Sequence, residues 1–283
     1  MVEINKTFLL AADLAGIGSM SLSSAVTIMQ LFGVNLALSP TVLLSTQSEG
    51  FGKTAKLNTA AFLQHSFSHW HQIGQEFSGT LVAYYEDEQV GALLKQWLVT
   101  TKPPLVIYDP ACADQGALYP NISVELLSQK KELLTLADVI CPNLTEASLL
   151  TGIKSAASKP ELYMKLLQAL ATSNPRADIV ITGISLGEKR GCVWLDQGKL
   201  QYALTPTLAS HFYGAGDVFS ALLSGFLLKG LSFSKAIRVT TNLLYSTLVA
   251  NLNSDRADSY GLDLSSLLAE FILRKDDFDD VIN

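Results

Sequence analysis

The chain of 283 residues carries little charge. Only 16% of its residues are Asp, Glu, Lys or Arg, and its formal net charge is −6. This balance gives no broad basic face, so neither nucleic acid nor an anionic membrane is expected as a partner. A negatively charged substrate would need local help from lysines, backbone amides or a metal ion.

Cysteine is also scarce. Cys112, Cys141 and Cys192 are widely separated, a spacing that fits neither a disulfide framework nor paired metal-binding cysteines. Reduced thiols in a cytoplasmic protein are expected. The apolar run 7–12 is broken by Asp13 and is too short for a signal sequence or a membrane-spanning helix. Neither secretion nor membrane insertion is therefore expected.

Linker-like sequence is absent as well. No stretch is rich in Pro, Gly or Ser, and there is no repeat or low-complexity segment. Hydrophobic residues make up 48% of the chain, which is ample for a buried core. A single domain over residues 1–283 is the prediction.

Short apolar runs alternate with segments of helical spacing along the first 181 residues. Continuous apolar runs are typical of buried parallel strands, and their alternation with helices predicts a doubly wound α/β sheet. The predicted strands are 7–12, 34–44, 80–84, 105–108, 138–141 and 178–181. The predicted helices are 21–32, 59–74, 88–98, 124–136 and 161–172.

The pattern changes after residue 181. Segments 192–195 and 200–204 flank the turn sequence DQGK at 196–199 and predict a β-hairpin. The rest of the chain predicts helices over 217–229, 234–252 and 264–275. We therefore expect a mostly parallel sheet that ends in antiparallel strands.

The run Gly214-Ala215-Gly216-Asp217 stands before an apolar helix. Glycines allow backbone N–H groups to gather around an anion at the positive end of a helix dipole. A neighbouring carboxylate could take the proton from a hydroxyl that attacks a phosphoryl group. The alternative is that Asp217 only caps the helix.

This run resembles the Gly-Ala/Thr-Gly-Asp signature of the ribokinase-like superfamily of small-molecule kinases. The resemblance implies a three-layer sandwich with helices on both faces of the sheet. It also implies that Asp217 is the catalytic base, and that the amides of Gly214, Ala215 and Gly216 stabilise charge on the transferring phosphoryl group.

A second motif, CPNLTE at 141–146, follows an apolar strand and opens a helix that closes at Gly152. It resembles the Asn-x-x-Glu motif of the same superfamily, which implies that Asn143 and Glu146 organise Mg²⁺ and its waters near the nucleotide phosphates. Residues three apart share a helix face, and Mg²⁺ favours oxygen ligands. On its own, the pair could equally form a capping box.

Two further strand ends carry polar residues. Asp109 ends an apolar strand, where open α/β sheets bind ligands, although Asp-Pro can also start a turn. Residues 109–119 resemble a stretch of pyridoxal kinases, which implies that Asp109 and Asp114 lie near metal and phosphates. Thr182 and Gly183 match a superfamily position that faces nucleotide phosphate, with an ordinary β-turn as the alternative.

Residues 25–34 and 40–45 also resemble pyridoxal kinases, and the early sugar-binding pattern of ribokinases is absent. The resemblance implies that Asp13, Ser48 and Tyr84 contact the ring of a vitamin B6 vitamer. Pyridoxal kinases commonly have serine where Asp13 stands. A carboxylate there could pair with a ring-nitrogen proton or an amine, which counts against pyridoxal and leaves pyridoxamine, pyridoxine and hydroxymethylpyrimidine open. Alternatively, Asp13 caps a turn.

Three histidines, His65, His69 and His71, lie on one predicted helix. His65 and His69 could share a face as metal ligands do, but no third ligand accompanies them. A solvated or interface helix is expected, and they are assigned no role.

The combined motifs predict an ATP- and Mg²⁺-dependent kinase that phosphorylates the hydroxymethyl group of a B6 vitamer, in the cytoplasm, for B6 salvage. The resemblance implies a homodimer. The alternatives are a hydroxymethylpyrimidine kinase of the same fold and a non-catalytic regulator that binds nucleotide or vitamer.

Overall fold

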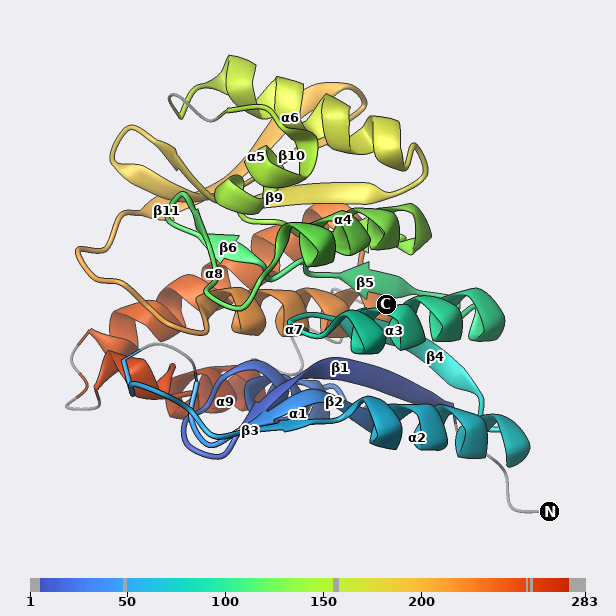
Figure 1. Ribbon diagram of the computed structural model, residues 1–283. Helices are drawn as coiled ribbons and strands as arrows, with labels where there is room; N and C mark the ends of the chain where they lie inside the picture. Colours follow the sequence, from blue (N-terminus) through green and yellow to red (C-terminus); the bar gives the residue numbers. More distant parts are fainter. Residues whose placement is uncertain (1–5, 48–49, 155–157, 253, 255–256, 275–283) are drawn as a thin grey trace.

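The computed structural model describes residues 6–47, 50–154, 158–252, 254 and 257–274. Its centre is a nine-stranded sheet in the order β11-β10-β9-β8-β5-β4-β1-β2-β3 (Figure 1). All pairings from β9 through to β2 are parallel, and the strands beyond them at both edges pair antiparallel. The strands are β1 (Thr7–Ala15), β2 (Leu36–Leu44), β3 (Lys56–Asn58), β4 (Phe77–Val82), β5 (Val106–Tyr108), β8 (Val139–Ile140), β9 (Asp178–Leu186), β10 (Lys189–Asp196) and β11 (Lys199–Pro206).

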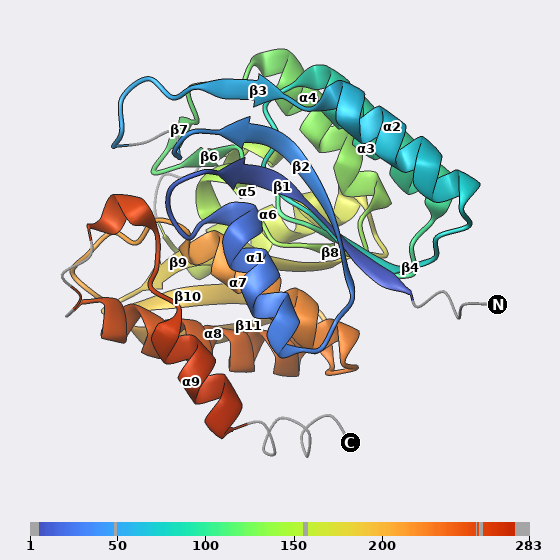
Figure 2. The ribbon, with the colours of Figure 1, turned by 90° about the horizontal axis from the view of Figure 1, so that it is seen from below.

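Helices cover both faces of the sheet (Figure 2). One face carries α1 (Ser21–Leu31), α7 (Ala215–Leu228), α8 (Phe233–Asn251) and α9 (Ser265–Leu273). The other face carries α2 (Ala60–Gln72), α3 (Glu88–Thr101), α4 (Val124–Leu133), α5 (Leu144–Thr151) and α6 (Pro160–Ser173). Two short 3₁₀ helices, η1 (Leu134–Leu136) and η2 (Asp258–Tyr260), complete the helical elements of the described residues.

The two faces of the sheet bury separate apolar cores. Along β1, Phe8 and Leu10 belong to the core under α1 and α7, whereas Leu9 and Ala11 belong to the core on the other face. Successive side chains of a strand point to opposite faces, so a strand covered on both sides is a nearly continuous apolar run. The predicted α/β sandwich with helices on both faces is confirmed.

The hairpin predicted after residue 181 is present and is longer than predicted. β10 and β11 pair from Lys189↔Pro206 to Asp196↔Lys199. The two turn residues, Gln197 and Gly198, have φ angles of +50° and +76°, as a type I′ turn requires. The expectation of antiparallel strands at the end of the sheet is confirmed.

Three short strands were not predicted from the sequence. β3 lies at the edge opposite the hairpin, and all of its residues are exposed. β6 (Ala113–Asp114) and β7 (Ala117–Leu118) form a separate two-stranded sheet. Strands of two or three residues are too short to show an alternating pattern.

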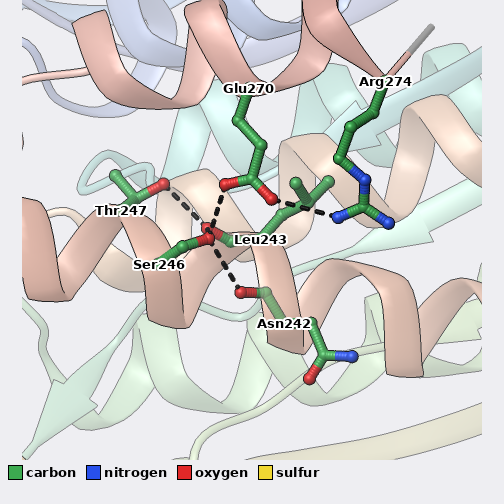
Figure 3. Close-up of polar contacts among 6 residues, drawn as sticks. All are labelled: Asn242, Leu243, Ser246, Thr247, Glu270 and Arg274. Atoms are coloured by element: carbon green, nitrogen blue, oxygen red, sulfur yellow. Dashed lines mark hydrogen bonds and ion pairs between the residues drawn. The ribbon is translucent and has the colours of Figure 1, made fainter.

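The helix α9 is held against α8 by a polar contact (Figure 3) and against the end of α1 by an aromatic contact. Ser246 Oγ donates to Glu270 Oε2 at 2.7 Å, and the Arg274 guanidinium pairs with Glu270 Oε1 at 3.0 Å. Phe271 packs edge-on against Phe32 of the core, with ring centroids 4.8 Å apart. The predicted helix over 264–275 is present, although its last residue lies outside the described part of the chain.

The described helices include none whose length and apolar character would suit it to cross a membrane.

Candidate active site

A cavity of about 570 Å³ opens where the parallel strands end and α7 begins. The carboxyl ends of parallel strands meet at one edge of a sheet, so motifs far apart in sequence come together there. Ser48 lies outside the described residues. All other predicted site residues line the cavity, namely Asp13, Tyr84, Asp109, Asp114, Asn143, Glu146, Thr182, Gly183, Gly214, Ala215, Gly216 and Asp217.

The N-terminus of α7 forms one end of this cavity. The helix begins at Ala215, two residues earlier than predicted, because Gly214 adopts a φ of +80° and serves as the N-cap. The first helical hydrogen bond runs from Val218 N to Gly214 O. The N–H groups of Ala215, Gly216 and Asp217 therefore have no partner within the helix and can bind an anion.

Asp217 is not the cap of α7. Its Oδ2 accepts a hydrogen bond from the backbone N–H of Ser21 at 2.8 Å. Burial, followed by the negative charge of Asp13, raises the pKa of Asp217 to about 8. A carboxylate with a pKa near neutrality is well matched to accept a proton from a hydroxyl.

Ser21 joins two of the carboxylates and was not predicted. Its N–H donates to Asp217, its Oγ donates to Asp13 Oδ1, and its side chain is buried. It adopts a φ of +49°, a conformation that costs a residue with a side chain about 1–2 kcal/mol. Such strain persists where surrounding contacts hold it, often at functional sites.

Asp13 reaches the cavity from an irregular point in β1. The register between β1 and β2 shifts between Ala12 and Leu14, next to the pair Ala12↔Pro40. A proline has no N–H to donate, and a bulge redirects the side chain that it contains. Burial raises the pKa of Asp13 to about 6, although the Ser21 hydroxyl acts in the opposite direction.

Asn143 and Glu146 form the capping box that the sequence left open. Glu146 N donates to Asn143 Oδ1 at 2.9 Å, and Asn143 N donates to Glu146 Oε2 at 2.8 Å. Cys112 N also donates to Glu146 Oε1 at 2.8 Å. The two residues thus hold the start of α5 and line the cavity as well.

Glu146 and Asp109 form a buried acidic pair. Burial is the main cause that raises the pKa of both carboxyls, and the charge of Glu146 raises that of Asp109 further. Lys130 of α4, which is fully buried, lies close enough to offset this charge in part. Its Nζ donates to Pro110 O at 3.0 Å and lies 3.6 Å from the centre of the Tyr85 ring.

Lys130 was not singled out by the sequence. It stands beside Lys131 in a polar stretch, where a solvated lysine is the ordinary expectation. Burial lowers the pKa of Lys130 to about 8, against the effect of the nearby Cys112, Glu146 and Asp109. Lys130 does not line the cavity, so it acts on the site through its charge, which partly offsets the burial that raises the pKa of Asp109 and Glu146.

The oxygen donors of Asp109, Asn143 and Glu146 suit a magnesium ion that keeps several of its waters. Carboxylate and amide oxygens are hard ligands of the kind that Mg²⁺ prefers. Both Glu146 oxygens already accept backbone N–H groups, and no cluster of three His, Cys, Asp or Glu side chains occurs in the described residues. The set therefore fits Mg²⁺ bound partly through water and does not form a closed protein cage.

The remaining predicted positions are held by local contacts. The Tyr84 hydroxyl donates to Glu86 Oε2 at 2.7 Å, and Asp114 Oδ1 accepts from Gln115 N at 2.8 Å. Thr182 N donates to Pro142 O at 2.9 Å, which places Thr182 beside Asn143. The three histidines of α2 are exposed and do not line the cavity.

The chain is similar to several kinases. It is 30% identical over 164 residues to a pyridoxal kinase of Dictyostelium discoideum, and the matched region covers 51% of this chain and 53% of that protein. It is 31% identical over 155 residues to a hydroxymethylpyrimidine/phosphomethylpyrimidine kinase of Haemophilus influenzae, which covers 52% and 56%. The chain thus spans about half the length of these curated relatives.

A solved structure resembles the whole fold. The crystal structure of pyridoxal kinase from Lactobacillus plantarum matches with a TM-score of 0.90 and 30% sequence identity, covering 96% of this chain and 98% of that one. Residues 84–260 match the family described as phosphomethylpyrimidine kinase. This match spans more than half of the chain and includes Asp109, Asn143, Glu146 and Asp217, and the protein therefore belongs to the phosphomethylpyrimidine kinase family.

Proposed function

We propose that this protein transfers the γ-phosphoryl group of ATP to the hydroxymethyl group of a vitamin B6 vitamer, namely pyridoxal, pyridoxamine or pyridoxine. The observation that carries the proposal is that Asp217 and the unpaired N–H groups at the N-terminus of α7 line the same cavity. Phosphoryl transfer needs a group that positions the nucleophile and donors that stabilise the transferring charge. Asp217 and the N–H groups beside it supply both.

The other site residues take roles around this centre. Asp109, Asp114, Asn143, Glu146, Thr182 and Gly183 bind the nucleotide. Asp109, Asn143 and Glu146 hold Mg²⁺, which neutralises phosphate charge when it is bound. Asp13, Ser48 and Tyr84 contact the acceptor, and the amides of Gly214, Ala215 and Gly216 bind the transferring phosphoryl group.

Family membership and the likeness to pyridoxal kinases support this substrate class. We further propose that residues 1–283 act as one kinase domain in a cytoplasmic homodimer that serves B6 salvage. The low charged fraction and the net charge of −6 support a protein without nucleic acid or membrane partners.

Phosphorylation of hydroxymethylpyrimidine is the second candidate function. The description of the family and the similarity to the Haemophilus influenzae enzyme favour it. The carboxylate of Asp13, which we place beside the acceptor substrate, suits any heterocycle that presents a protonated nitrogen or an amine. A regulator that binds ligands without turnover would keep the cavity but release no ADP.

ADP release, measured with each acceptor in turn, tests the proposal. With Mg²⁺ and ATP, turnover is expected on at least one B6 vitamer at a kcat/KM that exceeds the value for hydroxymethylpyrimidine. Chelation of Mg²⁺ should abolish this turnover. A higher kcat/KM for hydroxymethylpyrimidine would favour the second candidate, and absence of ADP release with every acceptor would contradict both.

Ser21→Gly tests the link between Asp13 and the acceptor. Glycine adopts a positive φ freely and keeps the N–H that binds Asp217, but it removes the hydroxyl that donates to Asp13. Without this donor the pKa of Asp13 should rise, so less of the carboxylate is ionised at pH 7. Steady-state kinetics should show an acceptor KM about 10-fold higher, with kcat little changed.

Ser21→Ala is the matched control for this change. It removes the same hydroxyl but keeps a side chain at a φ of +49°, so it should raise KM equally while being less stable than Ser21→Gly. An unchanged KM in both variants would show that the contact between Ser21 and Asp13 has no part in acceptor binding.

A further inference from the structure

The cavity has two walls of opposite chemical character. All of its carboxylates come from β1, from residues 109–146 and from Asp217. The other wall, formed by residues 182–216, contributes hydroxyl, glycine and imidazole groups and carries no carboxylate. Those phosphates of a nucleotide that Mg²⁺ does not screen are repelled by the carboxylates of the first wall and can lie against the second.

Positive charge is rare around the cavity. Of the residues that line it in the described part of the chain, Arg190 is the single Lys or Arg. Lys130 is buried behind the site and does not line the cavity. The N-terminus of α7 adds partial positive charge at one point only. Within the described lining of the cavity, a nucleotide polyphosphate that extends away from α7 would therefore meet one full positive charge, that of Arg190.

Arg190 is placed to use that charge. It lies in β10, paired with Ser185 of β9 and Thr205 of β11. One of its terminal nitrogens lies 3.7 Å from the point where a Cβ on Gly183 would stand. The guanidinium thus lies over Gly183, next to Thr182.

The guanidinium of Arg190 is also free of competing carboxylates. None of the ion pairs among the described residues includes it, and the residue is exposed. Arg pairs with phosphate oxygens through two parallel N–H donors. A free guanidinium on the carboxylate-free wall can therefore bind phosphate without first breaking a salt bridge.

We propose that Arg190 binds the polyphosphate of the nucleotide against the wall formed by Thr182, Gly183 and Thr205. The inference rests on the proposed function, because it takes a nucleotide as the ligand. It adds a positioning cation at a place where the sequence predicted only Thr182 and Gly183. Arg190 holds the donor nucleotide and takes no part in proton transfer.

Calorimetric titration of ATP, ADP and adenosine, with Mg²⁺ present, tests the proposal on Arg190→Gln. Loss of a charged hydrogen bond should weaken ATP and ADP binding about 10- to 100-fold. Adenosine lacks phosphate, so its affinity should stay within about twofold by the same reasoning. Arg190→Lys should fall between the wild type and Arg190→Gln, because lysine keeps the charge and loses the two-pronged geometry.

Lys189→Gln is the matched control. Lys189 precedes Arg190 in β10, is exposed and does not line the cavity, since neighbouring side chains of a strand point to opposite faces. The Lys189→Gln variant loses one positive charge, as Arg190→Gln does, and should bind ATP with the affinity of the wild type.

The outcomes separate the inference from the proposed function. Unchanged ATP affinity in Arg190→Gln, or an equal loss for adenosine and ATP, would overturn the role of Arg190 while leaving the kinase assignment intact. A wild-type protein that binds neither ATP nor ADP would overturn the proposed function and the role of Arg190 together.

Discussion

Asp217→Asn is expected to lower kcat by about 10²- to 10⁴-fold, the usual contribution of a positioned general base. An amide cannot accept the proton of the acceptor hydroxyl at neutral pH. The amide oxygen can still accept the N–H of Ser21, which Asp217 Oδ2 binds at 2.8 Å. The variant should therefore fold normally and bind ATP, and steady-state assays with saturating substrates should show the loss in kcat.

Asp196→Asn provides the control for this substitution. Asp196 ends β10 at the hairpin turn, is exposed and lies outside the cavity. It should show wild-type turnover. Near-normal turnover of Asp217→Asn would refute the assignment of Asp217 as the base, whereas a joint loss of ATP binding and turnover would point to a structural role for the carboxylate.

The sequence singled out residues that share one cavity, but it did not predict their contacts. Asp109, Asn143 and Thr182 each follow or end an apolar run, and the parallel arrangement of those runs brings their ends to one edge of the sheet. A local pattern and a general rule of α/β sheets were therefore sufficient. The common cavity contains every predicted site residue except Ser48, which lies outside the described residues.

Ser21 and Lys130 could not be predicted in this way. The positive φ of Ser21 occurs together with a hydrogen bond from its N–H to Asp217, 196 positions away in the chain. Lys130 is buried with its Nζ against Pro110 O and the Tyr85 ring, whereas its neighbours in sequence are polar. Both features arise from long-range packing and leave no local pattern.

Arg190 illustrates a third limit. Its position in an antiparallel strand was predicted only in part, because the predicted hairpin strand began at residue 192 and β10 begins at Lys189. Its value to the site depends on the absence of any other Lys or Arg from the cavity lining in the described part of the chain. That absence is a property of the folded lining. No single segment of the sequence contains that information.

The free energy of unfolding of the ligand-free protein is expected to fall between pH 5 and pH 8. Four carboxyls at the cavity, those of Asp13, Asp109, Glu146 and Asp217, have pKa values raised above their ordinary ones, chiefly by burial. The folded state thus binds these protons more tightly than the unfolded state does. Their stabilising effect is complete below pH of about 4 and is lost as the pH rises through their folded pKa values, which reach about 8 for Asp217.

Asp217→Asn isolates one of these contributions, because asparagine does not ionise. Urea unfolding should give similar free energies for the variant and the wild type at about pH 4, and the difference should grow as the pH rises above the unfolded pKa of the carboxyl. At pH 8 the variant should be more stable than the wild type by about 2–3 kcal/mol. One pKa unit corresponds to about 1.4 kcal/mol, and this figure is set below the full value of the shift to allow for partial screening by solvent. Asp196→Asn should follow the wild type at both pH values.

Parallel pH profiles for Asp217→Asn and the wild type would contradict this account, because they would mean that Asp217 ionises as easily in the folded protein as in the unfolded chain. A stability gain restricted to high pH would instead link the two properties of Asp217. The burial and the nearby Asp13 that raise its pKa suit it to accept a proton, and they also destabilise the fold when it is ionised. One substitution would then lower turnover and raise stability, as expected where a fold maintains an unfavourable charge for catalysis.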